Sequence, residues 1–371
     1  MSDPLSIVFF GTYDTVTHPR VQVLADGFRA HGHTVTEVNE PLGVTTAERL
    51  RTARQPWRAP ILAAKILRAW ARLWRRTRAL DVDADIVVVG YLGQFDIHLA
   101  TRLFDCPVVL DYMVGLGDTA LDRRMGPRSI VARLLRFVDR RATRAADLVL
   151  VDTEAQATTC AATRRRPIVT AVGATDEWFA DPTTAAGDPV GVIFFGLYTP
   201  LQGSPTIGAA IARLADRDDI SFTMIGDGQD RPETEAAAEA GDARWIDWLD
   251  PADLAAEVAR HHICLGVFGT TPKAARVVPN KVFQGAAAGC AVITGDSPSQ
   301  RAAFADAAVY VPFGDAVALA DAVAHLADDR NALERLRRAA FRRAVERFGP
   351  SRIVDPLDTA IRELLSDLSR V

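Results

Sequence analysis

Short, continuously hydrophobic runs alternate with longer stretches rich in Ala, Leu and Arg along the 371 residues of the chain. "LSIVFF" at 5–10 and "VGVIFFG" at 190–196 are examples of these runs. Unbroken hydrophobicity is typical of strands that are buried on both faces, whereas half-exposed strands alternate apolar and polar residues. The pattern therefore predicts an α/β fold in which helices cover parallel sheets.

The predicted strands form two groups, because six precede and five follow the Pro-, Gly- and Thr-rich segment Asp181–Pro189. Chains longer than about 250–300 residues usually divide into domains. We therefore expect two Rossmann-like domains, residues 1–180 and 190–348, whose sheets face each other across a cleft, with 181–189 as the linker. Residues 349–371 predict a helical tail that packs back on the first domain.

Charge is divided unevenly between the two halves. Residues 1–180 hold 24 Lys and Arg against 20 Asp and Glu, whereas 181–371 hold 19 against 27. The weakly positive first half has no nucleic-acid-binding motif, and nonspecific phosphate binding needs a much stronger basic field. We therefore expect no nucleic acid as a partner.

The four cysteines have no CxxC or Cys/His spacing, which argues against a zinc site and against a disulfide framework. The first residues lack a basic region ahead of a long apolar run, so "LSIVFF" is interpreted as a first strand and not as a signal peptide. No run reaches the roughly 18 apolar residues of a membrane span. The expected location is the cytoplasm.

The segment Lys273–Asp296, "KAARVVPNKVFQGAAAGCAVITGD", predicts an anion site. Pro279 favours a helix start there, and the N-terminus of a helix offers free N–H groups and partial positive charge. Lys273, Arg276 and Lys281 surround this start, and the small residues from Gly285 to Gly289 are expected to let a ligand approach the backbone closely. The alternative is an ordinary helix whose entry loop carries solvated cations.

The segment "PNKVFQGAAAGCAVIT" resembles the nucleotide-sugar motif of family 4 glycosyltransferases, and "FFGLYTPLQG" resembles the Gly-rich turn that opens their C-terminal domain. "VGATDEWFAD", "LVLVDTEAQATTC" and "IGDGQ" extend the similarity over most of the chain. The resemblance implies a GT-B fold and transfer of a sugar from a nucleoside diphosphate to a hydroxyl acceptor, with retention of configuration. Because the cations and helix N–H groups of the anion site would balance the charge of the diphosphate, neither a metal ion nor another cofactor is expected.

The same resemblance, together with the strand-end positions, assigns the candidate site residues. The acceptor would be a glycan, a lipid-linked molecule or a small molecule, bound by the first domain. The catalytic candidates are Asp111, Arg276 and Lys281; the donor-binding candidates are Gly11, Thr12, Gly196, Thr199, Gln202, Gly203, Gly226, Asp227, Lys273, Asn280 and Gln284; the acceptor or phosphate candidates are His18, Arg20, Asp118 and Arg123.

The sequence departs from the family pattern at two pairs of positions. Leu197 and Gln202 stand where the family commonly has an arginine and a lysine, and Arg276 and Gln284 stand where it commonly has two glutamates. Arg276 and Lys281 would then supply the positive charge from another wall of the site. A nucleotide-sugar epimerase of the same fold and a noncatalytic nucleotide-sugar-binding protein remain as alternatives.

The segment Arg49–Leu80 holds ten Lys and Arg and no acid. Five of its apolar residues recur at helical spacing, and basic residues occupy the other side of the predicted helix. This pattern fits an interfacial helix on an anionic membrane, and it equally fits a helix whose apolar side faces the domain core. The apolar residues are Leu62, Ile66, Trp70, Leu73 and Trp74.

Overall fold

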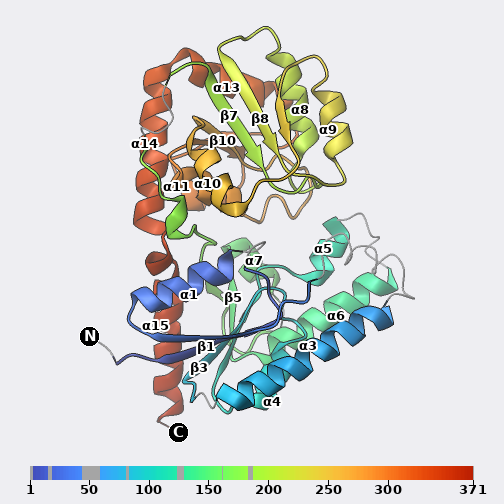
Figure 1. The fold of residues 1–371 in the computed structure, drawn as a ribbon, viewed down its shortest axis with the longest axis vertical. Helices are drawn as coiled ribbons and strands as arrows, with labels where there is room; N and C mark the ends of the chain where they lie inside the picture. Colours follow the sequence, from blue (N-terminus) through green and yellow to red (C-terminus); the bar gives the residue numbers. More distant parts are fainter. Residues whose placement is uncertain are drawn as a thin grey trace. The chain divides into compact units, whose positions relative to one another are not determined.

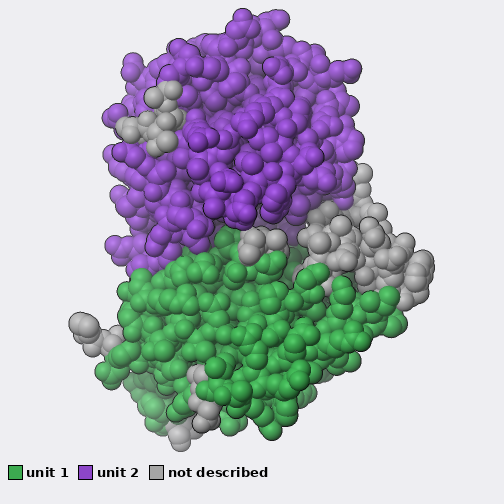
Figure 2. Space-filling model, in the orientation of Figure 1, with its two compact units in different colours: residues 1–170, 354–371 green, residues 171–353 purple. Residues whose placement is uncertain are grey.

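The computed structural model describes residues 3–15, 19–43, 59–80, 83–122, 129–160, 162–182 and 187–370. It divides the chain into two compact units (Figures 1 and 2). Unit 1 comprises residues 1–170 and 354–371, and unit 2 comprises residues 171–353. The predicted linker 181–189 therefore lies inside unit 2, and its residues 183–186 are outside the described part of the chain.

Unit 1 contains a six-stranded parallel sheet in the order β2-β1-β3-β4-β5-β6. Its core is formed by strand residues such as Val8, Val87 and Leu110, all of which are inaccessible to solvent. The strands are β1 (Ser6–Gly11), β2 (Thr34–Asn39), β3 (Ile86–Val89), β4 (Val108–Asp111), β5 (Leu148–Val151) and β6 (Ile168–Val169). The helices are α1 (Arg20–Ala30), α3 (Ala59–Leu80), α4 (Ile97–Leu103), α5 (Leu116–Asp122), α6 (Ile130–Ala145) and α7 (Glu154–Thr159).

Unit 2 contains a second six-stranded parallel sheet, in the order β12-β11-β10-β7-β8-β9. The strands are β7 (Val190–Phe195), β8 (Ile220–Ile225), β9 (Arg244–Ile246), β10 (Ile263–Leu265), β11 (Ala291–Gly295) and β12 (Val309–Val311). The helices are α8 (Ser204–Arg213), α9 (Arg231–Ala237), α10 (Pro251–Ala259), α11 (Asn280–Ala287), α12 (Pro298–Phe304), α13 (Ala316–Asp328) and α14 (Arg330–Arg347), with a 3₁₀ turn, η2, at Asp176–Trp178.

The predicted fold class, two parallel Rossmann-like sheets with flanking helices, is confirmed. All eleven hydrophobic runs form strands, and the pattern missed only β9. That strand is three residues long, starts with an exposed arginine and lies at the sheet edge, so it carries no continuous hydrophobic run. The expectation that the two sheets face each other across a cleft stays a prediction.

The C-terminal helix α15 (Pro350–Leu368) begins in unit 2 and continues in unit 1. Within unit 1, the Asp358 carboxylate lies 3.1 Å from His31 Nδ1 and 3.3 Å from His33 Nε2, and the Arg362 guanidinium donates to it. These contacts attach the helix to the segment between α1 and β2. No described helix is both long enough and apolar enough to cross a membrane.

Helix α3 turns the predicted apolar stripe mostly towards the core of unit 1. Leu73 is fully buried, and the Trp70 indole Nε1–H donates a hydrogen bond to Asp96 at 2.7 Å. Trp74 remains partly exposed, and the Arg78 guanidinium lies over its ring. Residues 49–58 of the basic segment are outside the described part of the chain. For Trp70 and Leu73, the structure therefore agrees with the core-facing alternative.

Candidate functional site

In the sheet of unit 2, the order in which successive strands are added changes direction between β7 and β10. From β7 the chain proceeds outward to β8 and β9, and it then returns to place β10 against the other side of β7. In open α/β sheets ligands bind outside the carboxyl ends of the strands at such a switch point. The loops that follow β7, β8 and β10 are therefore the first place to look for a site.

These three loops are interlocked through glycines. Gly203 precedes α8 with φ of +64°, and a Cβ there would lie 2.3 Å from the backbone nitrogen of Gly269. A Cβ on Gly226 would lie 2.0 Å from the carbonyl oxygen of Gly196. The Tyr198 N–H donates to the Asp227 carbonyl at 3.0 Å. Because no side chain fits at these crossings, the backbone forms the surface at the switch point.

Lys281, in the first turn of α11, extends its side chain to the end of β7. Its Nζ lies 3.5 Å from the centroid of the Phe194 ring and 3.4 Å from the position that a Cβ on Gly196 would take. The residue is only 4% exposed, and Nζ has no hydrogen-bond partner among the described residues. Burial lowers the pKa of this amine well below 10.5, because the charged form is separated from water.

A buried ammonium group without a hydrogen-bond partner is costly, and an anionic ligand would offset the cost. The start of α11 adds to this anion site, because its N-cap residue is Pro279, whose side chain makes no hydrogen bond to the first N–H groups of the helix. Groups whose pKa values are strongly shifted by burial cluster at functional sites. The arrangement can therefore neutralise a phosphate group at the β7 switch point.

The loop from Lys273 to Pro279, which leads into α11, is fixed from behind by α12. The Ser299 hydroxyl donates to the Arg276 carbonyl at 2.9 Å, and the Gln300 side-chain amide donates to the Val277 carbonyl at 3.4 Å. Both Lys273 and Arg276 are half-buried there. Of the three cations that were predicted to serve one site, Lys273 and Arg276 thus lie on the loop before α11, and Lys281 lies in the first turn of the helix.

The remaining donor-binding candidates lie on the same loops of unit 2. The carbonyl of Thr199 accepts the N–H groups of Gln202 and Gly203, which closes the turn after β7, and the buried Gln202 Oε1 has no hydrogen-bond partner among the described residues. The Asp227 carboxylate accepts the Gly228 N–H at 2.7 Å. Asn280 begins α11, half-buried, and Gln284 is buried one turn later.

Gly285 in α11 and Gly289 just after it face other protein atoms, so for these two residues the predicted close approach of a ligand is wrong. A Cβ on Gly285 would lie 2.4 Å from Cys264 Sγ in β10, and a Cβ on Gly289 would lie 2.7 Å from Pro182 Cα. Glycine at these positions lets the helix pack closely against its own sheet and lets the chain turn at the helix end, where Gly289 has φ of +79°.

In unit 1, Arg20 and Asp111 bind each other inside the core. Arg20 Nε lies 2.8 Å from Asp111 Oδ1, and neither side chain is exposed. The other guanidinium nitrogens of Arg20 donate to the carbonyl and hydroxyl of Thr170. Burial raises the pKa of Asp111, and the neighbouring guanidinium opposes that rise. The ion pair therefore attaches α1 to the ends of β4 and β6. Arg20 was predicted to bind the acceptor or a phosphate, and Asp111 was predicted to act in catalysis.

Thr12 is likewise engaged within unit 1. Its backbone N–H and its hydroxyl both donate to Asp96 Oδ2 at 2.8 Å, beside Gly11. The same carboxylate accepts the indole N–H of Trp70. Sequence reasoning missed Asp96, whose only signal was an acid within the hydrophobic segment "FDIHL". Asp118 lies half-buried in the first turn of α5. His18 and Arg123 fall outside the described residues.

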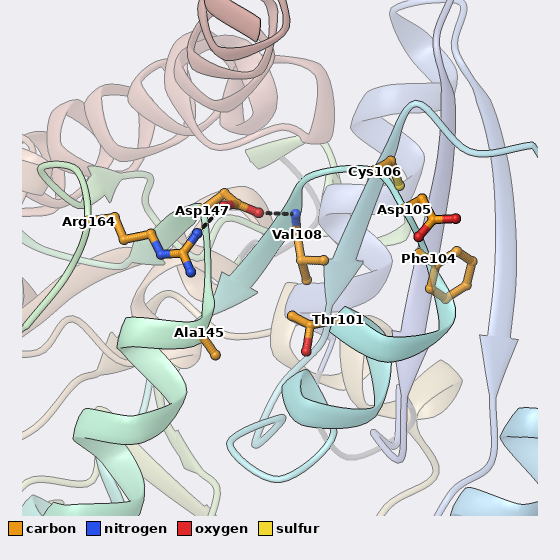
Figure 3. A pocket seen from close by; sticks show the side chains of 8 residues that line it. All are labelled: Thr101, Phe104, Asp105, Cys106, Val108, Ala145, Asp147 and Arg164. Carbon is orange, nitrogen blue, oxygen red and sulfur yellow. Dashed lines mark hydrogen bonds and ion pairs between the residues drawn. The ribbon is translucent and has the colours of Figure 1, made fainter.

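Two other groups in unit 1 do not support a site. A shallow pocket of about 320 Å³ lies near the amino ends of β4 and β5. There the Asp147 carboxylate accepts the Val108 N–H and pairs with Arg164 (Figure 3). Ligands of parallel sheets bind at the opposite end, outside the carboxyl ends of the strands.

His31, His33 and Asp358 are close enough to hold a metal ion. However, His33 Nδ1 accepts the Leu5 N–H, so in the neutral ring Nε2 carries the proton and cannot bind a metal.

Comparison with known proteins supports the fold. A family profile described as glycosyl transferase-like matches residues 208–358. Among solved structures, sucrose-phosphate synthase from Thermosynechococcus elongatus superposes with a TM-score of 0.73 at 14% identity, covering 98% of this chain and 100% of that chain. The trehalose-phosphate synthase of Burkholderia vietnamiensis gives 0.68 at 13% identity, with 97% of each chain covered.

Anabaena Alr3699/HepE in complex with UDP-glucose gives a TM-score of 0.66 at 14% identity, covering 98% of this chain and 100% of that chain. No curated protein matches the chain by sequence. At these identities the likeness concerns the fold. The chain therefore has the GT-B fold, and its second unit resembles the glycosyl transferase-like family.

Proposed function

We propose that the protein transfers a sugar from a nucleoside diphosphate sugar to a hydroxyl acceptor, with retention of configuration and without a metal ion. The observation that carries this proposal is the buried Lys281 amine, which lies at the β7 switch point and has no hydrogen-bond partner in the described part of the chain. Solved structures of the same fold in complex with UDP or UDP-glucose support a nucleoside diphosphate as the ligand.

The negative charge that develops on the departing diphosphate is the main electrostatic demand of this reaction. Lys281 would bind a phosphate oxygen as an ammonium group, and the uncapped N–H groups of α11 would donate to the same phosphate. Lys273 and Arg276 would add charge from the adjoining loop. These groups supply the positive charge that a divalent cation would otherwise provide, which is the reason for proposing metal independence.

The transfer step is written as a front-face displacement. The bond between the anomeric carbon and the phosphate oxygen breaks with its electron pair moving to that oxygen, and the acceptor oxygen bonds to the same face of the sugar. The acceptor proton moves to the leaving phosphate. This route requires no enzyme carboxylate as nucleophile, which distinguishes it from the paired-carboxylate route of retaining glycosidases.

Thermal unfolding with a panel of nucleotides and nucleotide sugars in EDTA tests the proposal. A true donor at about 100 times its dissociation constant should add about 2.7 kcal/mol to the free energy of unfolding, and its nucleoside diphosphate should be released in the presence of a hydroxyl acceptor. Metal independence is supported if the nucleoside diphosphate is released at the same rate in EDTA as in manganese. Stabilisation that requires manganese would contradict it.

The same panel distinguishes the alternatives. An epimerase would convert the nucleotide sugar without an acceptor, and a noncatalytic binding protein would be stabilised with no turnover. If no nucleoside diphosphate or nucleotide sugar stabilises the protein, the donor site itself is refuted.

A further inference from the structure

Helices α3, α4 and α6 cover one face of the sheet of unit 1. They connect β2 to β3, β3 to β4 and β4 to β5, which are steps in one direction across the sheet, whereas α1 connects β1 to β2 in the opposite direction. Right-handed crossovers place the first three helices on the same face and α1 on the other. Helix α4 contacts both α3 and α6, and Figure 1 shows the three together on the side away from α1.

This α3–α4–α6 layer carries most of the large apolar side chains that unit 1 exposes. Of the exposed large apolar residues described in unit 1, all except Leu368 lie on its helices or immediately beside α4. Isolated exposed apolar residues are ordinary, but a group of them on one face marks a binding surface. The group consists of Ile61, Leu67, Trp74, Leu80, Phe95, Ile130, Leu134 and Phe137.

Helix α6 exposes large apolar residues together with arginines, and its buried residues are small or polar. Ile130, Leu134 and Phe137 share one face at helical spacing and are 82%, 58% and 57% exposed. The buried side consists of Ala132, Asp139, Ala142 and Thr143. Asp139 is held there, because its carboxylate accepts the N–H groups of Leu116 and Gly117 at the start of α5. The packing of Asp139 against α5 therefore fixes the rotation of α6 about its axis, which turns Ile130, Leu134 and Phe137 outward.

Positive charge surrounds the apolar group. The three helices contain twelve Lys and Arg and one acid, and that acid is the buried Asp139. Glu40 pairs with Arg72 and Arg76 on one edge of α3. No described acid forms an ion pair with the exposed arginines of α6, which are Arg133, Arg140, Arg141 and Arg144.

We propose that the α3–α4–α6 layer docks unit 1 onto an anionic membrane, with Ile130, Leu134 and Phe137 of α6 entering the interface and the arginines beside them meeting lipid phosphates. Outward aliphatic and aromatic side chains flanked by arginines are the pattern of helices that lie in a membrane interface. Docking would favour a lipid-linked acceptor over a soluble one, a consequence that rests on the proposed function. The docking itself does not depend on the donor site.

Sedimentation with vesicles of phosphatidylcholine, with and without phosphatidylglycerol, tests the proposal on the full-length protein. Wild type should bind only the anionic vesicles, and less at high salt, because salt screens the charges. Leu134→Glu combined with Phe137→Glu should abolish binding. Changing Arg133, Arg140, Arg141 and Arg144 to Gln should weaken binding by about fivefold for each arginine.

Matched controls come from unit 2. Val317→Glu with Val345→Glu alters two exposed apolar residues of α13 and α14, and Arg338→Gln with Arg342→Gln alters two exposed arginines of α14. All control variants should bind vesicles as wild type does. Stabilisation by UDP, measured on every variant, reports on the donor site separately, so that a failure of docking and a failure of the proposed function are distinguishable.

Three results would overturn the proposal. The first is equal sedimentation of wild type with neutral and anionic vesicles. The second is unchanged binding by the Leu134→Glu, Phe137→Glu variant, which would show that charge alone holds the protein to lipid. The third is a wild-type dimer by sedimentation velocity that the same variant converts to a monomer without any vesicle binding, which would make this layer an interface between two copies of the chain.

Discussion

Replacing Lys281 by methionine should weaken nucleoside diphosphate binding by about tenfold to a hundredfold, the effect of losing a hydrogen bond from a charged donor. The same substitution should stabilise the unliganded protein, because methionine fills a similar volume and removes a buried amine to which no residue that the structure describes offers a hydrogen bond. Calorimetric titration with UDP and thermal unfolding without ligand measure the two effects. A lysine with a purely structural role would not give changes of opposite sign.

The stability difference should depend on pH. Because burial lowers the folded-state pKa of Lys281, the unfolded chain binds a proton that the folded chain does not bind between that lowered pKa and 10.5. The free energy of unfolding of wild type should therefore fall, relative to the variant, as the pH falls through this window. Lys65→Met on α3 is the control and should change neither UDP affinity nor this slope. Unchanged UDP affinity in Lys281→Met would remove the basis of the donor site.

Replacing Arg20 by methionine should destabilise the protein by about 3–5 kcal/mol, because it leaves Asp111 in the core without its cation. Only the effect of burial then remains to raise the pKa of that carboxyl. The variant should consequently take up a proton on Asp111, and its deficit in stability should be smaller at about pH 5 than at about pH 8. Denaturant unfolding at the two pH values measures both effects.

The double variant Arg20→Met, Asp111→Leu separates structure from catalysis. Replacing both partners of a buried ion pair by apolar residues is often neutral or stabilising, so the double variant should recover most of the lost stability. If Asp111 only fastens α1 to β4, transfer activity should return with the fold. A stable but inactive double variant would instead support the catalytic role that the sequence predicted for Asp111.

The sequence predicted the strands well because each is a local, continuous hydrophobic signal. It missed β9, which is short and half-exposed. It could not decide whether the apolar stripe of α3 faces the core or a membrane, because the apolar residues of that helix are not all buried together with Leu73. Leu67 and Trp74 contribute to an exposed flank, and the indole of Trp70 is fixed by Asp96, which is distant in sequence.

The candidate site shows the same division between local and distant information. Lys281 could be selected from its place after Pro279 in the sequence, but its burial depends on Phe194 and Gly196, which lie more than eighty residues earlier. Arg20 and Asp111 were selected as separate strand-end or loop residues, and nothing in the sequence indicated that they form a pair across unit 1. The role of Gly285 was misassigned because a small residue that faces a ligand and one that faces a strand look alike in sequence.

The interlocked glycines of unit 2 also limit how the protein can be engineered or can diverge. At Gly203, Gly226 and Gly269 any side chain would collide with backbone atoms, and Gly196 has a φ of +127° that strains any other residue, so libraries that vary these four positions should yield mostly unfolded protein. Variation in donor preference must then arise from side chains around this fixed backbone. Leu197 and Trp248 are exposed on the loops that follow β7 and β9, so sequence change at these two positions should cost the fold little.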